Sequence, residues 1–343
     1  MSNARELAQL PSVPSGRRNL IYNGAMQVAQ RGTTGNITTG TFGYPSIDRY
    51  LFSVSNTTAA MSVAQDSDAP DGFSKSMKIT TTTAATLSAN HAVTMRHNIE
   101  GQDVQSLAYG SANAKQATVS FWVKSSLTGN VCVGLNTGAF SRIITSTITI
   151  NSANTWEKKS ITFAGDTVTA ITNDNANRFG LYIALTAGST FNSSDSTSWG
   201  AFSNGGFCYG QTLDLAGTLN ATFQITGIQL EVGSVATEFE HRSYGEELAL
   251  CQRYYQNQNH DSVLSGYVTV SAYHYFSHDL PVSMRASPSI TLSYVGAGGS
   301  LGSATVPLVW APSITETGFY VYKQAISSGN GYTAYKYTAD AEL

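Results

Sequence analysis

Carboxylate side chains are a natural first place to look for chemistry, because glycoside hydrolysis ordinarily uses two of them facing one cleft. The sequence offers scattered candidates, each beside a turn or a strand end: Glu157, Asp166, Asp174 and Glu231. No pair among them has a spacing that singles it out for acid and base roles. Cys251 falls on the apolar stripe of a predicted helix, which favours packing over nucleophilic attack. We therefore expect no catalytic residue, no cofactor and no enzymatic activity.

Metal ligands are the next possibility. Asp66, Asp68 and Asp71 cluster beside a glycine, and calcium prefers such oxygen-rich loops. The spacing departs from that of an EF-hand, and the Pro-Asp-Gly sequence at 70–72 is typical of a solvated turn, so both interpretations stay open. His274 and His278 would lie about 13 Å apart on a strand, too far to share one ion. We expect no metal site at the histidines.

Aromatic side chains are the best candidates for recognition, since a flat apolar ring can stack on a sugar while polar neighbours bind its hydroxyls. Two tryptophans lie in polar or proline-containing stretches, and two segments, 267–275 and 332–337, are rich in tyrosine. The tyrosine-rich faces could instead contact other subunits. Four residues are accordingly our glycan-contact candidates: Trp199, Trp310, Tyr273 and Tyr335.

Composition excludes several classes of protein. The chain has 343 residues, a formal net charge of -3 and only 12% charged residues. Without a basic stripe it is a poor nucleic-acid binder, because neutralisation of phosphates dominates such binding. No window approaches the ~20 apolar residues of a membrane span, and the N-terminus lacks the apolar core of a secretion signal. Three cysteines are too few and too scattered for a disulfide framework.

Elements that could position these side chains are mostly short strands. Over 118–124 and 144–150, apolar residues alternate with polar ones, the period expected when one face of a sheet is buried. Dense turn sequences separate such segments, which favours an antiparallel sandwich or jelly roll over residues 20–240. Trp122 and Trp156 lie in strand patterns, so we expect both in the core.

One strand, at 222–232, carries an internal change of phase. Phe223 and Ile225 set one phase, whereas Ile228 and Leu230 set the opposite one. The change falls at Gly227, where a β-bulge would let all four side chains face one core. The pattern therefore predicts a bent strand in a curved sheet.

A short helix and a second β domain are expected to follow. Ser243 and Glu246 match a capping box, and an apolar stripe of Tyr244, Leu248, Cys251 and Tyr255 has helical spacing. This predicts a connector helix over 241–256. Residues 257–343 read as a smaller β-sandwich, with strands at 266–276, 289–295, 318–322 and 332–337. The fold class is thus all-β: an N-terminal jelly-roll β-sandwich and a smaller C-terminal β-sandwich, joined by one short helix.

Residues 1–19 read as a separate leader. A two-turn helix would place Leu7 and Leu10 on one side, with Arg5 beside them, before Pro11 ends it. So short a helix is marginal alone and needs a surface to pack on. The segment is therefore either a frayed terminus or an anchoring peptide that orders on a larger assembly, with Leu7, Leu10 and Arg5 as its docking residues.

Several stretches resemble a known family. Residues 19–32 (NLIYNGAMQVAQRG) and 47–50 (IDRY) resemble the opening of virion structural proteins of tailed phages. Residues 228–255 resemble the closing strand and connector of that family, and 284–288 with 339–343 resemble its distal module. The matching motifs are scaffold residues and transfer no binding residue.

This resemblance implies a jelly roll similar to carbohydrate-binding modules and a non-enzymatic structural or adhesive role. It also implies a homotrimer on the exterior of the virion, partnered by other virion proteins through residues 1–19 and by a host-surface glycan. Heptads and repeats, which build long fibre shafts, are missing from the sequence. A short tail fibre or adhesin fits best, a capsid decoration protein is the alternative, and a polysaccharide depolymerase is a remote one.

Overall fold

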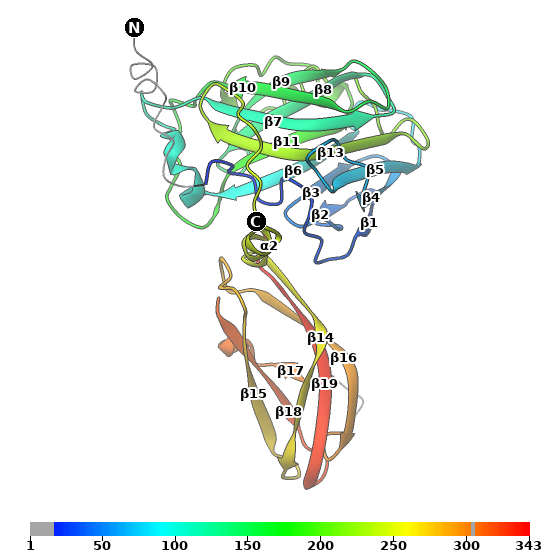
Figure 1. Ribbon diagram of the computed structural model, residues 1–343, viewed down its shortest axis with the longest axis vertical. Helices are drawn as coiled ribbons and strands as arrows, with labels where there is room; N and C mark the ends of the chain where they lie inside the picture. Colours follow the sequence, from blue (N-terminus) through cyan, green and yellow to red (C-terminus); the bar gives the residue numbers. More distant parts are fainter. Residues whose placement is uncertain (1–16, 303–305) are drawn as a thin grey trace. The chain divides into compact units, whose positions relative to one another are not determined.

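The computed structural model describes residues 17–302 and 306–343. The chain divides at the Ser243–Tyr244 junction into two compact units, here called the N-terminal and C-terminal units. Both are built from antiparallel strands, which confirms the all-β prediction (Figure 1). Among the described residues, no helix has the length and apolar character needed to span a membrane.

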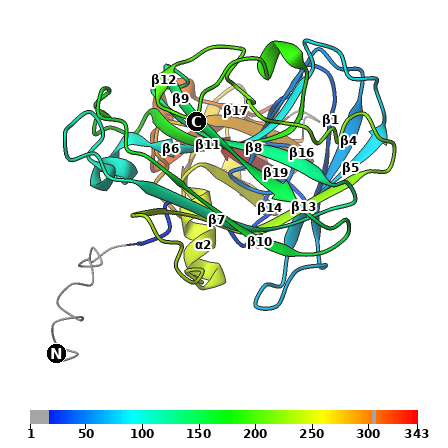
Figure 2. The ribbon, with the colours of Figure 1, turned by 90° about the horizontal axis from the view of Figure 1, so that it is seen from above.

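The N-terminal unit is a sandwich of two sheets, shown from two directions in Figures 1 and 2. The six-stranded sheet has the order β1 (Thr34–Ile37), β4 (Ala60–Asp66), β5 (Ser76–Thr83), β13 (Thr222–Val232), β7 (Ala117–Ser125), β10 (Glu157–Phe163). The seven-stranded sheet has the order β12 (Gly200–Ala201), β9 (Arg142–Ile150), β8 (Gly129–Thr137), β11 (Asn177–Ala187), β6 (Ala92–Glu100), β3 (Leu51–Ser55), β2 (Phe42–Gly43). Two 3-10 helices, η1 (Gly101–Leu107) and η2 (Ser189–Phe191), lie between strands.

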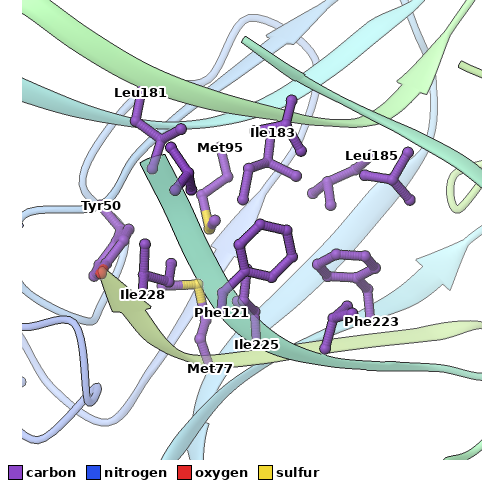
Figure 3. Close-up of a cluster of buried hydrophobic side chains, with 14 of the residues drawn as sticks. Tyr50, Met77, Met95, Phe121, Leu181, Ile183, Leu185, Phe223, Ile225 and Ile228 are labelled. Carbon is purple, nitrogen blue, oxygen red and sulfur yellow. The ribbon is translucent and has the colours of Figure 1, made fainter. Parts of the chain in front are cut away.

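The core lies between these sheets, as the alternation of the sequence requires. Phe121 of β7 and Ile183 of β11 are fully buried and point toward one another's sheets (Figure 3). Their strand neighbours, such as Trp122, project from the opposite faces. Each sheet therefore presents a second, outward face whose side chains are available for other contacts.

Gly227 forms the predicted bulge in β13. The pairing of β13 with β7 shifts register between Thr226 and Gln229, and Gly227 has a φ of 64°. That left-handed conformation is open to glycine without steric cost. The shift brings Phe223 and Ile228, from opposite sides of the bulge, into the same core (Figure 3).

Residues at the end of the predicted leader belong to the N-terminal unit. Asn19 is buried, its Nδ2 donates to the Ile228 carbonyl (3.1 Å) and its Oδ1 accepts from the Leu230 amide (3.1 Å). Arg18 donates to the Glu238 carbonyl. The boundary at residue 19 is therefore too late, because Asn19 satisfies backbone groups beside the β13 bulge. Arg5, Leu7 and Leu10 lie outside the described residues.

The connector helix is shorter than predicted. Helix α2 spans Tyr244–Gln252 instead of 241–256, because Tyr255 already begins β14 and pairs with Asp340. Leu250 and Cys251 are buried, whereas Tyr244 is exposed. The predicted apolar stripe, which began at Tyr244, was therefore displaced around the helix.

The C-terminal unit contains two three-stranded sheets (Figure 1). One has the order β14 (Tyr255–Val268), β19 (Gly329–Asp340), β16 (Ser289–Gly299), and the other β15 (Tyr273–Asp279), β18 (Gly318–Gln324), β17 (Leu308–Val309), with a 3-10 turn η3 (Ala311–Ser313). The single strand predicted at 266–276 is wrong. A turn at 269–272, with Ser271 at a φ of 64°, splits it between β14 and β15 and so between two sheets.

Candidate functional site

Strands β15 and β18 display a set of aromatic rings on the outward side of their sheet. In the antiparallel register Tyr275 lies opposite Tyr322, and Ser277 lies opposite Tyr320. Alternation along β18 sends Phe319 and Val321 into the core, where both are buried, and leaves Tyr320 and Tyr322 on the other side. The backbone of this sheet therefore fixes the spacing and orientation of the tyrosines.

Trp310 extends this row from the segment between β17 and η3. Its backbone amide donates to the Tyr320 carbonyl (2.9 Å), which holds the residue at the edge of β18. The indole lies 5.8 Å from the Tyr275 ring and 6.2 Å from the Tyr320 ring, centroid to centroid, both near edge-to-face. Tyr322 contacts the Tyr275 ring at 5.5 Å and the Tyr273 ring at 5.7 Å. We call these five residues, Tyr273, Tyr275, Trp310, Tyr320 and Tyr322, the aromatic face.

The aromatic face is exposed to solvent, although it consists of large aromatic side chains. Tyr273 is 55% exposed, Tyr275 54%, Trp310 45% and Tyr320 43%. Single exposed aromatic residues are ordinary, but contiguous apolar patches on a protein surface mark sites of interaction. Ring–ring contacts already limit the freedom of these side chains, so a flat ligand would meet a largely preorganised surface.

A shallow hollow of about 270 Å³ adjoins the aromatic face. It is lined by Tyr273, Val306, Leu308, Tyr322, Lys323, Gln324 and Ile326. The Gln324 amide donates to the Ser271 carbonyl (3.1 Å) and supplies a polar edge beside the rings. Such a combination of ring faces with a few amide and hydroxyl groups can bind the apolar faces and hydroxyls of a pyranose.

Of the four glycan-contact candidates, Tyr273 and Trp310 lie on the aromatic face, and their role in binding stays a prediction. Tyr335 does not lie on an outer surface: it is 0% exposed and its hydroxyl contacts His278 Nε2. Burial raises the pKa of the Tyr335 hydroxyl above its usual range. The expectation for Tyr335 was wrong because β19 directs Tyr332, rather than Tyr335, outward.

Trp199, the fourth candidate, belongs to the N-terminal unit and is half-buried there. Its Nε1 donates to the Ala164 carbonyl (2.7 Å), and its ring meets Tyr109 edge-to-face at 5.7 Å. The side chain packs against the core of the sandwich. These contacts hold the Trp199 side chain in its polar loop, and its role in glycan contact stays a prediction.

Two other tryptophans were expected in the core and lie outside it. Trp122 and Trp156 are half-buried on the outward side of the six-stranded sheet. Trp156 Nε1 donates to Asp68 Oδ1 (3.1 Å), and Lys124 Nζ lies 5.4 Å from the Trp156 ring centroid. Trp122 follows Phe121 in β7 and must therefore take the opposite phase.

Two of the three clustered aspartates, Asp66 and Asp68, are engaged by protein groups. Asp68 binds Lys124 and accepts from Trp156, and the hydrogen bond from Lys124 is the main reason that the pKa of Asp68 is lowered. Asp66 accepts from the Asp68 amide (2.8 Å) and lies 3.4 Å from Lys78 Nζ. Within the described residues, no three histidine, cysteine or acidic side chains form a metal-binding group.

The scattered carboxylates also have partners within the fold. Asp166 forms an ion pair with Arg142 (2.8 Å), and Asp174 forms one with Arg178 (2.6 Å). Glu231 accepts from the Thr237 hydroxyl (2.7 Å). Glu157 accepts from Lys159 Nζ (2.5 Å) and from the Asn151 amide (2.9 Å). These contacts tie strands to neighbouring loops.

One motif was missed by the sequence analysis. Residues 298–302 read Gly-Gly-Ser-Leu-Gly, the Gly-x-Ser-x-Gly pattern of a hydrolase nucleophile elbow. In that elbow the serine sits on a turn between a strand and a helix, whereas here Ser300 follows β16 in a tight turn and is buried. Its Oγ accepts a hydrogen bond from the Ser327 hydroxyl (3.0 Å) instead of contacting a histidine base. The Gly-x-Ser-x-Gly sequence therefore forms a structural turn here.

Tyr320 and Tyr322 were likewise not named as site residues. The signal was present in the alternation of 318–322, where Phe319 and Val321 take one phase and the two tyrosines the other. Sequence alone could not show that Trp310 would join them. Fold and site together define an all-β protein that carries an exposed aromatic face on its smaller unit.

No protein-family model matches the chain, and no curated protein matches it in sequence. Similar solved structures include the enzymatically active domain of tailspike protein 4 of bacteriophage CBA120, with 13% identity and a TM-score of 0.32 over 62% of this chain and 21% of that one. They also include a family 11 carbohydrate-binding module from Clostridium thermocellum (12% identity, TM-score 0.29, 61% of this chain and 98% of that one).

A third similar structure is the C-terminal family 22 carbohydrate-binding module of Clostridium thermocellum Xyn10B, with 8% identity and a TM-score of 0.31 over 65% of this chain and all of that one (100%). At such identities and TM-scores these structures assign no function to this chain. Its function has to be argued from its own residues.

Proposed function

We propose that this protein is a virion adhesin whose aromatic face binds a glycan on the host surface. The observation that carries the proposal is the group of five contacting aromatic residues, four of which are more than 40% exposed. The sequence resemblance to virion proteins of tailed phages supplies the biological setting. The face itself supplies the chemistry.

Stacking is the expected mode of binding. A pyranose presents a patch of C–H groups, which gains from contact with an aromatic ring by apolar burial and dispersion. The five residues of the aromatic face are uncharged, and Lys323, the charged residue that lines the adjoining hollow, is buried and donates to the Thr333 hydroxyl (3.3 Å). We therefore expect the face to prefer neutral sugars. Several weak contacts per chain would be multiplied if copies assembled, because linked sites bind with avidity.

Binding to immobilised neutral polysaccharides, namely galactan, xylan, mannan and β-glucan, tests the proposal. We expect at least one to bind, and we expect Trp310→Ala and Tyr275→Ala each to weaken that binding about tenfold, equivalent to ~1.4 kcal/mol. Tyr267→Ala is the matched control, since Tyr267 is exposed on β14 and lies outside the aromatic face. Equal losses in all three variants, or no loss in any, would contradict glycan binding by this face.

A second role for the same face is contact between copies of the chain. Homotrimerisation, expected from the family resemblance, would also cover exposed tyrosines and a tryptophan, residues common in interfaces. Sedimentation analysis separates the two roles: Trp310→Ala should leave the assembly state unchanged if the face binds glycan. A shift of that variant to monomers would assign the face to assembly.

Anchoring of the protein to the virion through residues 1–19 is part of the proposal. A particle reconstruction would show whether these residues contact the tail, as proposed for a short fibre, or the capsid, as for a decoration protein. Deletion of residues 1–16 should remove the protein from particles without altering glycan binding. Retention of the truncated protein on particles would argue against this anchor.

We further propose that the protein binds its glycan without cleaving it. The principal carboxylates considered for catalysis are each engaged in contacts that tie strands to loops. Incubation with each bound polysaccharide should release no new reducing ends and no unsaturated products. Release of either would revive the depolymerase alternative.

A further inference from the structure

A pocket in the N-terminal unit lies on the outward side of the seven-stranded sheet, away from the sandwich core. Its cavity of about 290 Å³ is just below the ~300–1,000 Å³ typical of drug-sized ligand sites, and it is large enough for one sugar-sized group. Ser53, Ser55 and Thr94, from β3 and β6, line it with hydroxyl groups. Phe140, from the turn between β8 and β9, and Phe207, from the segment between β12 and β13, line it with aromatic rings.

Arg96 of β6 is the charged side chain of this pocket. Its Cζ lies 4.7 Å from the centroid of the Phe140 ring and 5.5 Å from that of Phe207. Its Nε donates to Thr94 Oγ1 (3.1 Å), which fixes the orientation of the guanidinium. In the part of the chain that the structure describes, no aspartate or glutamate forms an ion pair with it; the ionisable groups that act on it are Cys208 and Tyr182.

A partly desolvated guanidinium without a carboxylate is costly, and burial lowers the pKa of Arg96. Contacts with the two rings recover part of that cost, as cation–π interactions do. The five N–H donors of an arginine form a planar fork that matches a carboxylate, and the bond to Thr94 uses only one of them. The others are left to a ligand that reaches the pocket.

Phe140 is held over the pocket by an unusual turn. Gly138, Ala139 and Phe140 all have positive φ values, of 55°, 51° and 71°. For residues other than glycine this conformation costs roughly 1–2 kcal/mol each, and such strain is concentrated at ligand sites. The turn places a ring on the guanidinium instead of leaving it in solvent.

We propose that this pocket binds a carboxylate-bearing sugar, such as a uronic acid unit of a surface polysaccharide. Arg96 would bind the carboxylate through two N–H groups, the phenylalanine rings would pack against the sugar ring, and the serine hydroxyls would meet its hydroxyls. The site belongs to the N-terminal unit and shares no residue with the aromatic face. It therefore stands or fails independently of the function proposed above.

Sodium glucuronate is the probe, with its uncharged methyl ester and sodium acetate as matched comparisons. In the full-length protein labelled with ¹⁵N-arginine, glucuronate should shift the Arg96 Nε–H resonance in a saturable way. Its affinity should be at least tenfold higher than that of the ester or of acetate. No shift with glucuronate, or equal affinity for acetate, would overturn the proposal, the latter by revealing a simple anion site.

Substitution provides the second arm. Arg96→Met should weaken glucuronate binding at least tenfold, and Arg96→Lys should fall between it and the wild type, because lysine keeps the charge without the fork. Arg31→Met is the control, since Arg31 also lies over an aromatic ring, that of Tyr44 (5.1 Å), outside the pocket. Unchanged binding in Arg96→Met would refute the assignment. If that variant does not fold, the resonance of the wild-type protein decides.

Discussion

Both units carry aromatic side chains on the outward face of a sheet, but these rings are buried in the N-terminal unit and exposed in the C-terminal unit. In the N-terminal unit, Phe207 lies over Tyr182 of β11 and both are buried (0–6% exposed). In the C-terminal unit, Tyr275 and Trp310 remain about half exposed. The difference follows from the length of the connections. Residues 188–221, between β11 and β13, supply a cover over the first face, whereas no connection among the described residues of the β15–β18–β17 sheet is comparably long.

The rings on the two faces therefore contribute differently to the stability of the protein. Rings covered by the protein's own loops contribute to its stability, as core residues do. Rings left uncovered contribute little to stability and gain their free energy only when something else covers them. The pocket of Arg96 lies where the cover over the N-terminal face is incomplete, so it combines features of both situations.

The largest expected effect is on the covered face. Phe207 stacks on Tyr182 at 4.9 Å and meets Phe140 at 5.6 Å, so Phe207→Ala should leave a cavity in this layer and lower the free energy of unfolding by ~3–5 kcal/mol. Phe202→Ala, which removes a more exposed ring of the same loop region, should cost far less. Urea denaturation followed by tryptophan fluorescence measures both.

A background substitution makes that measurement specific to one unit. The chain has four tryptophans, and Trp310 alone lies in the C-terminal unit. In a Trp310→Phe background the fluorescence therefore reports the N-terminal unit. Equal, small losses for Phe207→Ala and Phe202→Ala would show that the covering loops do not stabilise the sandwich.

Lowering the pH should reduce the free energy of unfolding of the N-terminal unit more than that of the C-terminal unit, by less than the Phe207→Ala effect. His97 is buried in the N-terminal unit, and desolvation, followed by Arg49 and Arg242, holds its pKa well below 6.5. Nε2 of its neutral ring accepts a hydrogen bond from the Tyr22 backbone amide (3.4 Å). Because the unfolded chain takes up the proton more readily, unfolding becomes easier as the pH falls below about 6.5, by at most ~1.4 kcal/mol per pH unit.

His278 of the C-terminal unit has a pKa lowered by partial desolvation, while Asp279 opposes the shift, so we expect a smaller loss there. Calorimetry between pH 7.5 and 5 should show the N-terminal transition falling further, and His97→Gln should flatten its slope. This window lies above the titration of paired carboxylates such as Glu157, whose pKa is about 2. An unchanged slope in His97→Gln would assign the acid sensitivity to other groups.

How far the sequence predicted this molecule depends on whether the signal was local. Alternation within a strand correctly placed Phe121 inward, and a change of phase correctly located the bulge at Gly227. The same alternation required Trp122 to face outward, and the expectation that tryptophans are buried wrongly overrode it. Strand alternation alone would have placed Trp122 on the outward face, and it is a better guide here than the general burial of tryptophan.

Other features had no local signal. The turn at 269–272 lacks glycine, proline and asparagine, so nothing marked the break between β14 and β15. Tyr335 and Trp310 looked equivalent, and only pairing across the sheets buried one and exposed the other. Arg96 meets rings that lie 44 and 111 residues further along the chain, at Phe140 and Phe207. Such a pocket exists only once the tertiary fold brings distant loops together.

The smallest expected effect on stability comes from the exposed face. Trp310→Ala removes a larger ring system than Phe207→Ala does. It should nevertheless lower the stability of the C-terminal unit by no more than ~1 kcal/mol, since much of that ring is already in solvent. Phe319→Ala, on the buried side of β18, is the internal reference and should cost ~3–5 kcal/mol. Calorimetry of the C-terminal transition measures both variants.

The outcome bears directly on the meaning of the aromatic face. A variant that keeps its stability but loses glycan binding shows that the rings are maintained for contact with a ligand. If Trp310→Ala instead destabilised the unit as much as Phe319→Ala, the face would be part of the core of an assembly. The uncovered rings would then be covered by other copies of the chain, because burial between subunits stabilises a fold in the same way as burial within it.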